Sequence, residues 1–149
     1  MKNDRKREPV KSDDTVAPSL AAFCFATCEW NVVWCCERIK PGSLKRFVGD
    51  ELTAGKIGKR FIDIVRNMPR FHVREQLEKL AVIFLSLIEL RNAILHAKPC
   101  TGPSEEARLH SRKVIEIADL EDAADQFEDC SIKLNRLLHG FLATFSPAS

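Results

Sequence analysis

VREQLEKLAVIFLSLIELRNAILHA, from Val73 to Ala97, is the stretch of sequence that decides the fold. At about 100° per residue its apolar side chains form one helical stripe, and the middle of the helix is apolar on nearly every side. The stripe consists of Leu77, Leu80, Phe84, Leu87 and Ile88. A helix that is apolar all round is buried all round, which in a chain of 149 residues indicates a core on one side and a second subunit on the other.

A single arginine, Arg91, falls near the middle of this stripe. A cation on a buried face is costly unless it is paired or used. Arg91 is therefore either half of a buried ion pair, with one of the acids of the last helix such as Asp122 or Asp125 as its partner, or part of a functional site. His96 follows five positions later at the end of the helix, and the polar Asn92 lies between them.

Further helices are expected on both sides of this one. The first begins near Ser19, a good N-cap, and ends at Pro41-Gly42. It is apolar on most sides, which indicates burial on more than one face. The apolar positions are Leu20, Phe23, Cys24, Trp30, Val33, Trp34 and Ile39. Trp30 and Trp34 are accordingly expected in the core.

The remaining segments complete a helical domain. A short helix is expected near 44–52, an amphipathic helix over 56–68, and a last helix with Asp119 as its N-cap. Residues 100–117 are expected to be an unusually long loop, with a brief extended piece at 112–117. Helices joined by short connections predict an all-α fold, an antiparallel four-helix bundle.

The chain divides into three parts by composition. Residues 1–18 are polar, charged and punctuated by prolines, which predicts a disordered basic N-terminal arm. Residues 19–145 form the helical domain, and 146–149 are a short tail.

Charge is distributed unevenly along the chain, although its net value is only +2. Residues 38–79 hold 11 Lys and Arg against 5 Asp and Glu, a local balance of +6. Residues 116–129 hold 7 acids and no bases. This pattern fits either an anionic partner bound at one face or two ordinary solvated faces.

The six cysteines do not form a metal or disulfide framework. Four of them, Cys24, Cys28, Cys35 and Cys36, share one apolar helix, without the paired spacing of a zinc site. Buried, reduced thiols in a cytoplasmic protein are the simpler interpretation. The most apolar run, 20–36, contains Glu29 and is short for a bilayer, so no membrane partner is expected.

Arg91-Asn92-x-x-x-His96, near the end of the third long helix of an all-helical domain, resembles the signature of the HEPN superfamily. The resemblance covers about residues 19–145 and includes the local string ELRNAILHA. It implies a four-helix bundle that dimerises, with a composite cleft and, in many members, RNA cleavage without a metal or other cofactor. It also implies that Arg91 and His96 are the catalytic pair and that Asn92 supports them.

Helical geometry limits how Arg91 and His96 meet. Five residues turn about 140° along a helix, so the two side chains do not share one face. They can converge if the last turn unwinds, or if each subunit of a two-fold dimer lends one group to a shared cleft.

These expectations define two function classes. The first is a cytoplasmic, homodimeric, metal-independent endoribonuclease of toxin or defence type, acting on RNA and held in check by an antitoxin protein where one exists. The second is a non-catalytic helical interaction or nucleotide-binding domain that uses the same junction.

Overall fold

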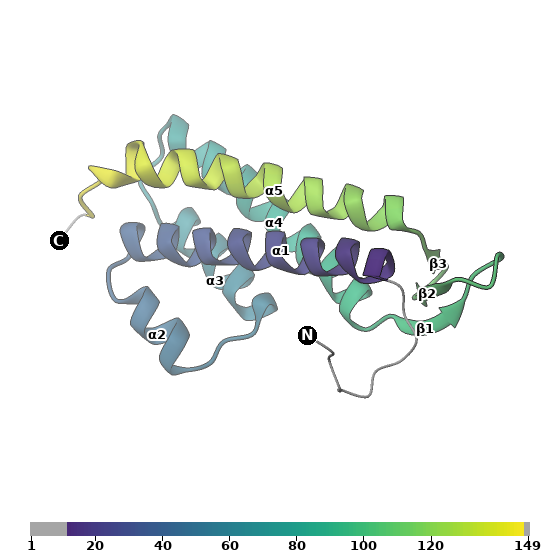
Figure 1. The fold of residues 1–149 in the computed structure, drawn as a ribbon. Coiled ribbons are helices and arrows are strands. Elements are labelled where there is room, and N and C mark those ends of the chain that lie inside the picture. Colours follow the sequence, from purple (N-terminus) through teal and green to yellow (C-terminus); the bar gives the residue numbers. More distant parts are fainter. Residues whose placement is uncertain (1–11, 148–149) are drawn as a thin grey trace, which may run out of the picture.

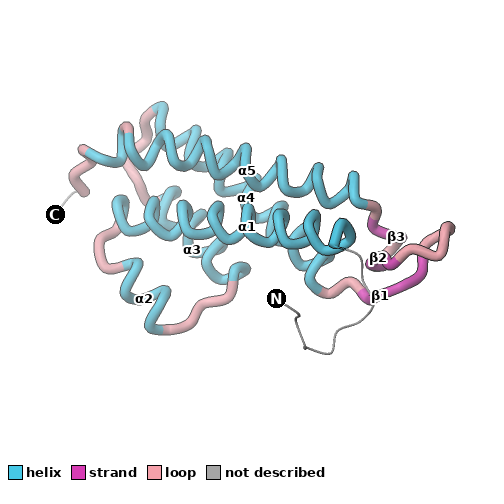
Figure 2. Tube along the Cα trace, in the orientation of Figure 1, coloured by secondary structure: helices cyan, strands magenta, loops and turns pink. Residues whose placement is uncertain are grey.

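The computed structural model describes residues 12–147, which are mostly helical with one small antiparallel sheet (Figures 1 and 2). Its elements in chain order are α1 (Ser12–Ile39), α2 (Ser43–Gly49), α3 (Ala54–Arg66), α4 (His72–Leu95), β1 (Lys98–Thr101), β2 (Ala107–His110), β3 (Val114–Ile115), α5 (Ile117–His139) and a 3-10 helix, η1 (Phe141–Ala143). The predominantly helical class predicted from the sequence is confirmed, whereas the sheet was not expected.

The long helices α1 and α5 lie side by side and run in the same direction (Figure 1). The residue numbers of their contacts increase together along both helices. The Phe25 ring meets the Phe127 ring edge-on at a centroid distance of 5.2 Å, and Asn31 Nδ2 donates to Ser131 Oγ at 2.8 Å. The predicted antiparallel packing therefore does not describe this pair. The short helix α2 and the loop after it carry the chain back along α1 before α3 begins. Helix α4 then runs opposite to α5.

The core is continuous across α1, α3, α4 and α5, with a contribution from Phe47 of α2. The predicted stripe of α4 is buried at Leu77, Leu80, Phe84, Leu87 and Ile88. By contrast the outer face of α4 carries Lys79, Ser86 and Glu89 beside the half-exposed Val82 and Ile83. The helix is thus not apolar all round, and its outer face is mixed.

Helix α1 begins at Ser12, seven residues before the predicted start at Ser19. Residues 12–17 of the expected arm are helical, and Pro18 lies inside the helix. Tertiary contacts explain the extension: Ala17 is buried against Ile115 and Leu120, and Asp14 accepts a hydrogen bond from Arg108 Nη1 at 3.1 Å. The rest of the predicted arm, 1–11, and the end of the tail, 148–149, lie outside the described residues.

The predicted loop at 100–117 instead contains most of a three-stranded antiparallel sheet in the order β1-β2-β3. Lys98 pairs with His110 across β1 and β2, and Leu109 pairs with Ile115 across β2 and β3. Helix α5 then begins at Ile117 rather than after an Asp119 N-cap. Glu116 is its N-cap, and the Glu116 and Asp119 side chains form a capping box with each other's backbone N–H groups.

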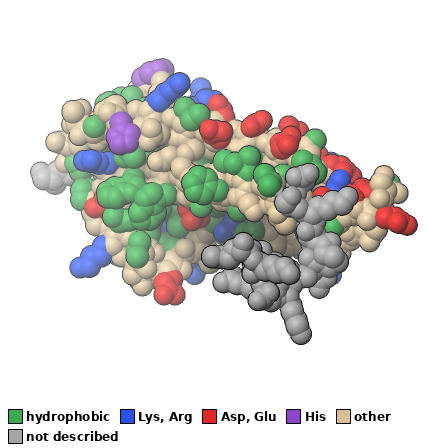
Figure 3. Space-filling model, in the orientation of Figure 1, with side chains coloured by type: hydrophobic (Ala, Val, Ile, Leu, Met, Phe, Trp, Pro, Cys, Tyr) green, Lys and Arg blue, Asp and Glu red, His purple; other side chains and the backbone are tan. Residues whose placement is uncertain are grey.

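One face of α1 is apolar but exposed, contrary to the expectation of burial. Leu20, Phe23 and Trp30 are 48%, 72% and 50% exposed, and Val16 continues the same stripe. Hydrophobic side chains are visible over this region in Figure 3. By length and composition α1 over Asp14–Ile39 is also able to cross a membrane, a property that the buried helices of other proteins share.

A close approach of α3 to α4 yields a stability prediction. A methyl group at Gly58 would lie 2.7 Å from Ile88 Cδ1 and 2.8 Å from Leu85 Cδ2. Gly58→Ala should therefore lower the free energy of unfolding by about 1–2 kcal/mol in urea denaturation, because overpacking outweighs the gain in helix propensity.

Gly55 of the same helix provides the matched control, since a Cβ there meets nothing within 4 Å. Gly55→Ala should raise the free energy of unfolding by about 0.5–1 kcal/mol. Equal effects of the two substitutions would contradict the close packing of α3 on α4.

Candidate functional site

Arg91 lies on the inward face of α4, one turn beyond the buried Phe84–Ile88 segment, and is half-buried. Its guanidinium carbon is 5.0 Å from the centroid of the Phe25 ring of α1, a cation–π geometry. Its Nη1 donates to Asn92 Oδ1 at 3.0 Å. The predicted position of Arg91 on the inward stripe of α4 is confirmed. The structure adds its contact with the Phe25 ring.

The ion pair predicted for Arg91 as an alternative to a functional site is not found within the described residues. Asp122 and Asp125 are exposed on α5, and within residues 12–147 no salt bridge joins either of them to Arg91. The charge of Arg91 acts instead on the carboxyl group of Glu29, which lies one turn after Phe25 on α1. Burial raises the pKa of the Glu29 carboxyl, and the Arg91 charge offsets part of that rise.

His96 lies at the C-cap of α4 and is exposed. Its backbone N–H donates to the Asn92 carbonyl at 2.9 Å, which closes the last helical turn. That turn does not unwind far enough to bring the two predicted catalytic side chains together, and the described residues include no contact between the Arg91 and His96 side chains. Within one subunit the described residues therefore do not bring the Arg91 and His96 side chains together.

A small pocket of about 210 Å³ opens beside Arg91. It lies between the first turns of α1, the last turns of α4 and strand β2, and it is apolar except for the arginine. Pro18, Ala22, Ile94, Leu95 and Leu109 are among its lining residues. A cation at an apolar opening is poorly solvated and therefore attracts an anionic group strongly.

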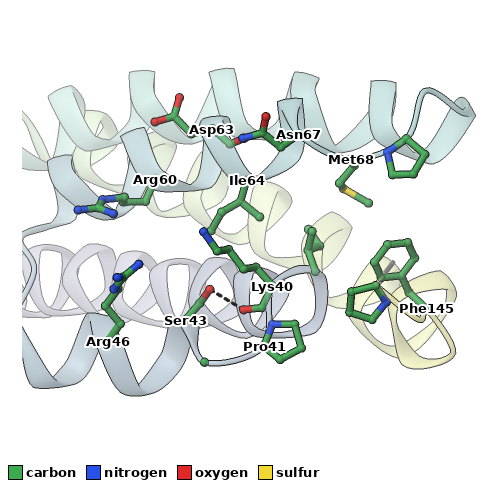
Figure 4. Close-up of a pocket in the computed structure, with 14 residues that line it drawn as sticks. Lys40, Pro41, Ser43, Arg46, Arg60, Asp63, Ile64, Asn67, Met68 and Phe145 are labelled. Carbon is green, nitrogen blue, oxygen red and sulfur yellow. Dashed lines mark hydrogen bonds between the residues drawn. The ribbon is translucent and has the colours of Figure 1, made fainter. Parts of the chain in front are cut away.

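A larger groove of about 810 Å³ lies at the opposite end of α4 (Figure 4). It was not predicted from the sequence. We call it the α2–α3 groove. It is lined by Lys40, Arg46 and Arg60 together with apolar side chains from α1, α3 and the C-terminal segment. The only sequence signal for it was the excess of positive charge over residues 38–79.

Acidic side chains gather elsewhere, over the first half of α5 (Figure 3). They include Glu121, Asp122, Asp125 and Glu128, all exposed. The uneven charge of the sequence is therefore uneven in space as well, with a basic groove at one end of the molecule and acids along one helix near the other.

The cysteines pack between helices. Cys28, Cys35, Cys36 and Cys130 are buried and unpaired, as expected for reduced thiols. Burial raises the pKa of the Cys35 thiol to about 12, and this thiol donates to the Leu134 carbonyl at 3.8 Å. The Cys35 thiol therefore stays protonated at neutral pH. In the described part of the chain no cluster of three or more His, Cys, Asp or Glu is placed to hold a metal ion.

The raised pKa of Glu29 predicts a pH dependence of stability. A carboxyl with a higher pKa in the folded state favours folding at low pH, and that contribution is lost as the pH rises from the unfolded pKa through the folded one. Glu29→Gln should therefore raise the melting temperature at pH 7 relative to the unaltered protein, while the difference should vanish near pH 4. A Glu29→Gln protein that is less stable at pH 7 would show that the attraction to Arg91 outweighs burial.

No family model, no curated protein sequence and no solved structure matches this chain. The HEPN resemblance therefore rests on Arg91, Asn92, His96 and the helix that carries them, and stays a prediction.

Proposed function

We propose that this chain is a HEPN-like, metal-independent endoribonuclease whose active site forms between two subunits. The proposal rests on the contacts and burial of Arg91. It is a half-buried cation held by Phe25 and Asn92, without an ion pair in the described part of the chain, on a helix that ends in the exposed His96.

Arg91 suits the recognition of a phosphate. A guanidinium offers a planar fork of donors that matches two phosphate oxygens, and a partly desolvated fork binds an anion more strongly than a solvated one. The hydrogen bond to Asn92 and the Phe25 ring restrict the arginine before any ligand arrives. Such a preorganised cation is the kind of group that stabilises the extra negative charge of a phosphorane.

His96 suits proton transfer, because an imidazole ring has one nitrogen that can accept a proton and one that can donate it. In the proposed reaction the ribose 2′-oxygen attacks the adjacent phosphorus and loses its proton, while the bond to the 5′-oxygen breaks and that oxygen gains a proton. The products are a 2′,3′-cyclic phosphate and a 5′-hydroxyl. We assign His96 to proton transfer and Arg91 to charge stabilisation, with Asn92 as a positioning residue.

Arg91 and His96 point about 140° apart on one helix. In the proposed two-fold dimer, Arg91 of one subunit lies near His96 of the other. Leu95 is exposed between them, and it offers apolar surface for a partner subunit at the end of α4. The function class implies a cytoplasmic enzyme of toxin or defence type with cellular or foreign RNA as substrate. An antitoxin protein that covers the site is a natural partner for it.

The first prediction concerns activity. The unaltered protein should cleave single-stranded RNA in the presence of EDTA and leave cyclic phosphate ends. Arg91→Ala and His96→Ala should each reduce the rate by at least about a hundredfold, because each removes one catalytic contribution of that order. Arg91→Lys should recover only part of the activity, since it restores the charge but not the fork.

His72→Ala is the matched control, because His72 is an exposed histidine at the other end of α4 whose ring contacts Gln76. It should retain full activity. Circular dichroism should show unchanged helix content in every variant. Equal activity in the unaltered, Arg91→Ala and His96→Ala proteins would refute the assignment and favour a binding domain.

A second prediction concerns assembly. Light scattering should show a dimer at micromolar concentrations, and Leu95→Glu should convert it to a folded monomer that no longer cleaves RNA. Val48→Glu is the control, since Val48 of α2 is 59% exposed against 54% for Leu95 but lies far from α4's end. An unaltered protein that is monomeric would rule out the composite site.

A further inference from the structure

The α2–α3 groove lies about the length of α4 away from Arg91 and His96. Its walls come from the end of α1 and the turn after it, from α2, from the second half of α3, and from the segment after η1. Because α4 has 24 residues, about 36 Å separates its two ends at the usual rise. The groove is therefore not part of the catalytic site of the same subunit.

The groove has a cationic end built from three separate elements. Lys40 follows α1, Arg46 belongs to α2 and Arg60 belongs to α3, and Figure 4 shows their charged ends gathered on one side of the groove. Within the described part of the chain none of the three side chains forms a hydrogen bond or an ion pair. One acid, Asp63, lines the rim, so the groove keeps a net positive charge.

The other end of the groove is apolar and aromatic. Met68 and Phe145 lie there beside Pro41 in Figure 4, and Ile64 forms part of the wall between the two ends. Phe145 is half-buried, and its ring packs against Phe141 at a centroid distance of 5.7 Å. A ring supported on one side in this way presents its remaining surface to the groove.

We propose that the α2–α3 groove is a second binding site for single-stranded RNA, remote from the point of cleavage. Phosphates of the strand lie at Lys40, Arg46 and Arg60, and a base packs against Phe145 and Met68. The proposal deepens the ribonuclease function and rests on it for the choice of RNA as ligand. It assigns the groove the role of holding the strand whose distant part reaches Arg91.

The shape and charge of the groove favour a nucleotide strand over an acidic peptide. Arginine forks match phosphate oxygens in pairs, and base stacking on an aromatic ring tolerates any sequence. A strand of nucleotides offers both groups at regular spacing, as the two ends of the groove require. An acidic peptide offers the anions without the flat ring that the aromatic end accommodates.

Equilibrium binding tests this proposal without relying on cleavage. Fluorescence anisotropy of a 5′-labelled single-stranded RNA should be measured with the full chain carrying His96→Ala, so that the probe stays intact. Arg46→Glu and Arg60→Glu in that background should each weaken binding about tenfold or more and lower the salt dependence of the binding constant. Phe145→Ala should also weaken binding about tenfold.

Neighbouring lysines provide matched controls. Lys45 and Lys59 are exposed, precede Arg46 and Arg60 on the same helices, and do not line the groove. Lys45→Glu and Lys59→Glu change the net charge by the same amount and should weaken binding less than threefold. Equal losses within each pair would show that only the overall charge matters, and would overturn the proposal.

Two further outcomes are decisive. An acidic peptide of equal net charge that displaces the RNA at the same concentration would overturn the choice of ligand. Loss of RNA binding in the Arg46 and Arg60 variants, together with no cleavage by any form of the protein, would refute the ribonuclease function but keep the groove as an RNA site. Failure of the groove and failure of the catalytic assignment are thus distinguishable.

Discussion

The rest of the structure depends on one aromatic side chain, Phe25. Its ring stacks on Phe84 of α4 at 5.9 Å, meets Phe127 of α5 edge-on at 5.2 Å, and lies 5.0 Å from the Arg91 guanidinium. Three helices that are distant in sequence therefore meet at one ring. Aromatic pairs of this kind add to the free energy gained by burial alone, and their geometry restricts how the helices are rotated.

The rotation of α4 that Phe25 imposes explains the position of the candidate site. With Phe84 turned into the core, Arg91 faces α1 two turns later, while His96 turns away toward the surface. The helix stays regular to Leu95, and the Arg91 and His96 side chains therefore point in different directions within one subunit. A chemistry that uses both side chains then requires a second copy of the protein.

The same helix also separates the two proposed regions. Arg91 and His96 lie at its C-terminal end, while the α2–α3 groove lies beside its N-terminal end. The acids of α5 lie over the half of the molecule that contains Arg91, and Lys40, Arg46 and Arg60 of the groove lie at the other end. If RNA is the ligand, as proposed, this charge distribution favours its approach to the groove over the exposed face of α5.

Helical periodicity predicted much of the fold. The buried stripe of α4, the amphipathic α3 and the end of α1 at Pro41-Gly42 lie close to where the sequence placed them. Of the sheet at 98–115, only β3 lies in a piece predicted to be extended, at 112–117; β1 and β2 were missed because strands of four residues are too short for a visible alternation. They are stabilised by hydrogen bonds to one another and by the pairing of Arg108 with Asp14 and Glu116.

The exposed face of α1 shows a different limit. Leu20, Phe23 and Trp30 have the composition of a core, and no local rule distinguishes them from Phe25 and Cys28, which are buried. Which of two apolar faces is covered depends on the helices that pack against it. The groove was missed for a similar reason, because Lys40, Arg46 and Arg60 become neighbours only when α2 folds back against α1 and α3 packs beside it.

The sequence by itself determined the helical class, the stripe that buries α4, the inward position of Arg91 and the end of its helix at His96, since these follow from the spacing of side chains along one helix. The tertiary structure alone decided the parallel packing of α1 and α5, the ring that Arg91 contacts and the gathering of three cations in one groove. These features depend on contacts between segments far apart in the chain, which local periodicity does not encode.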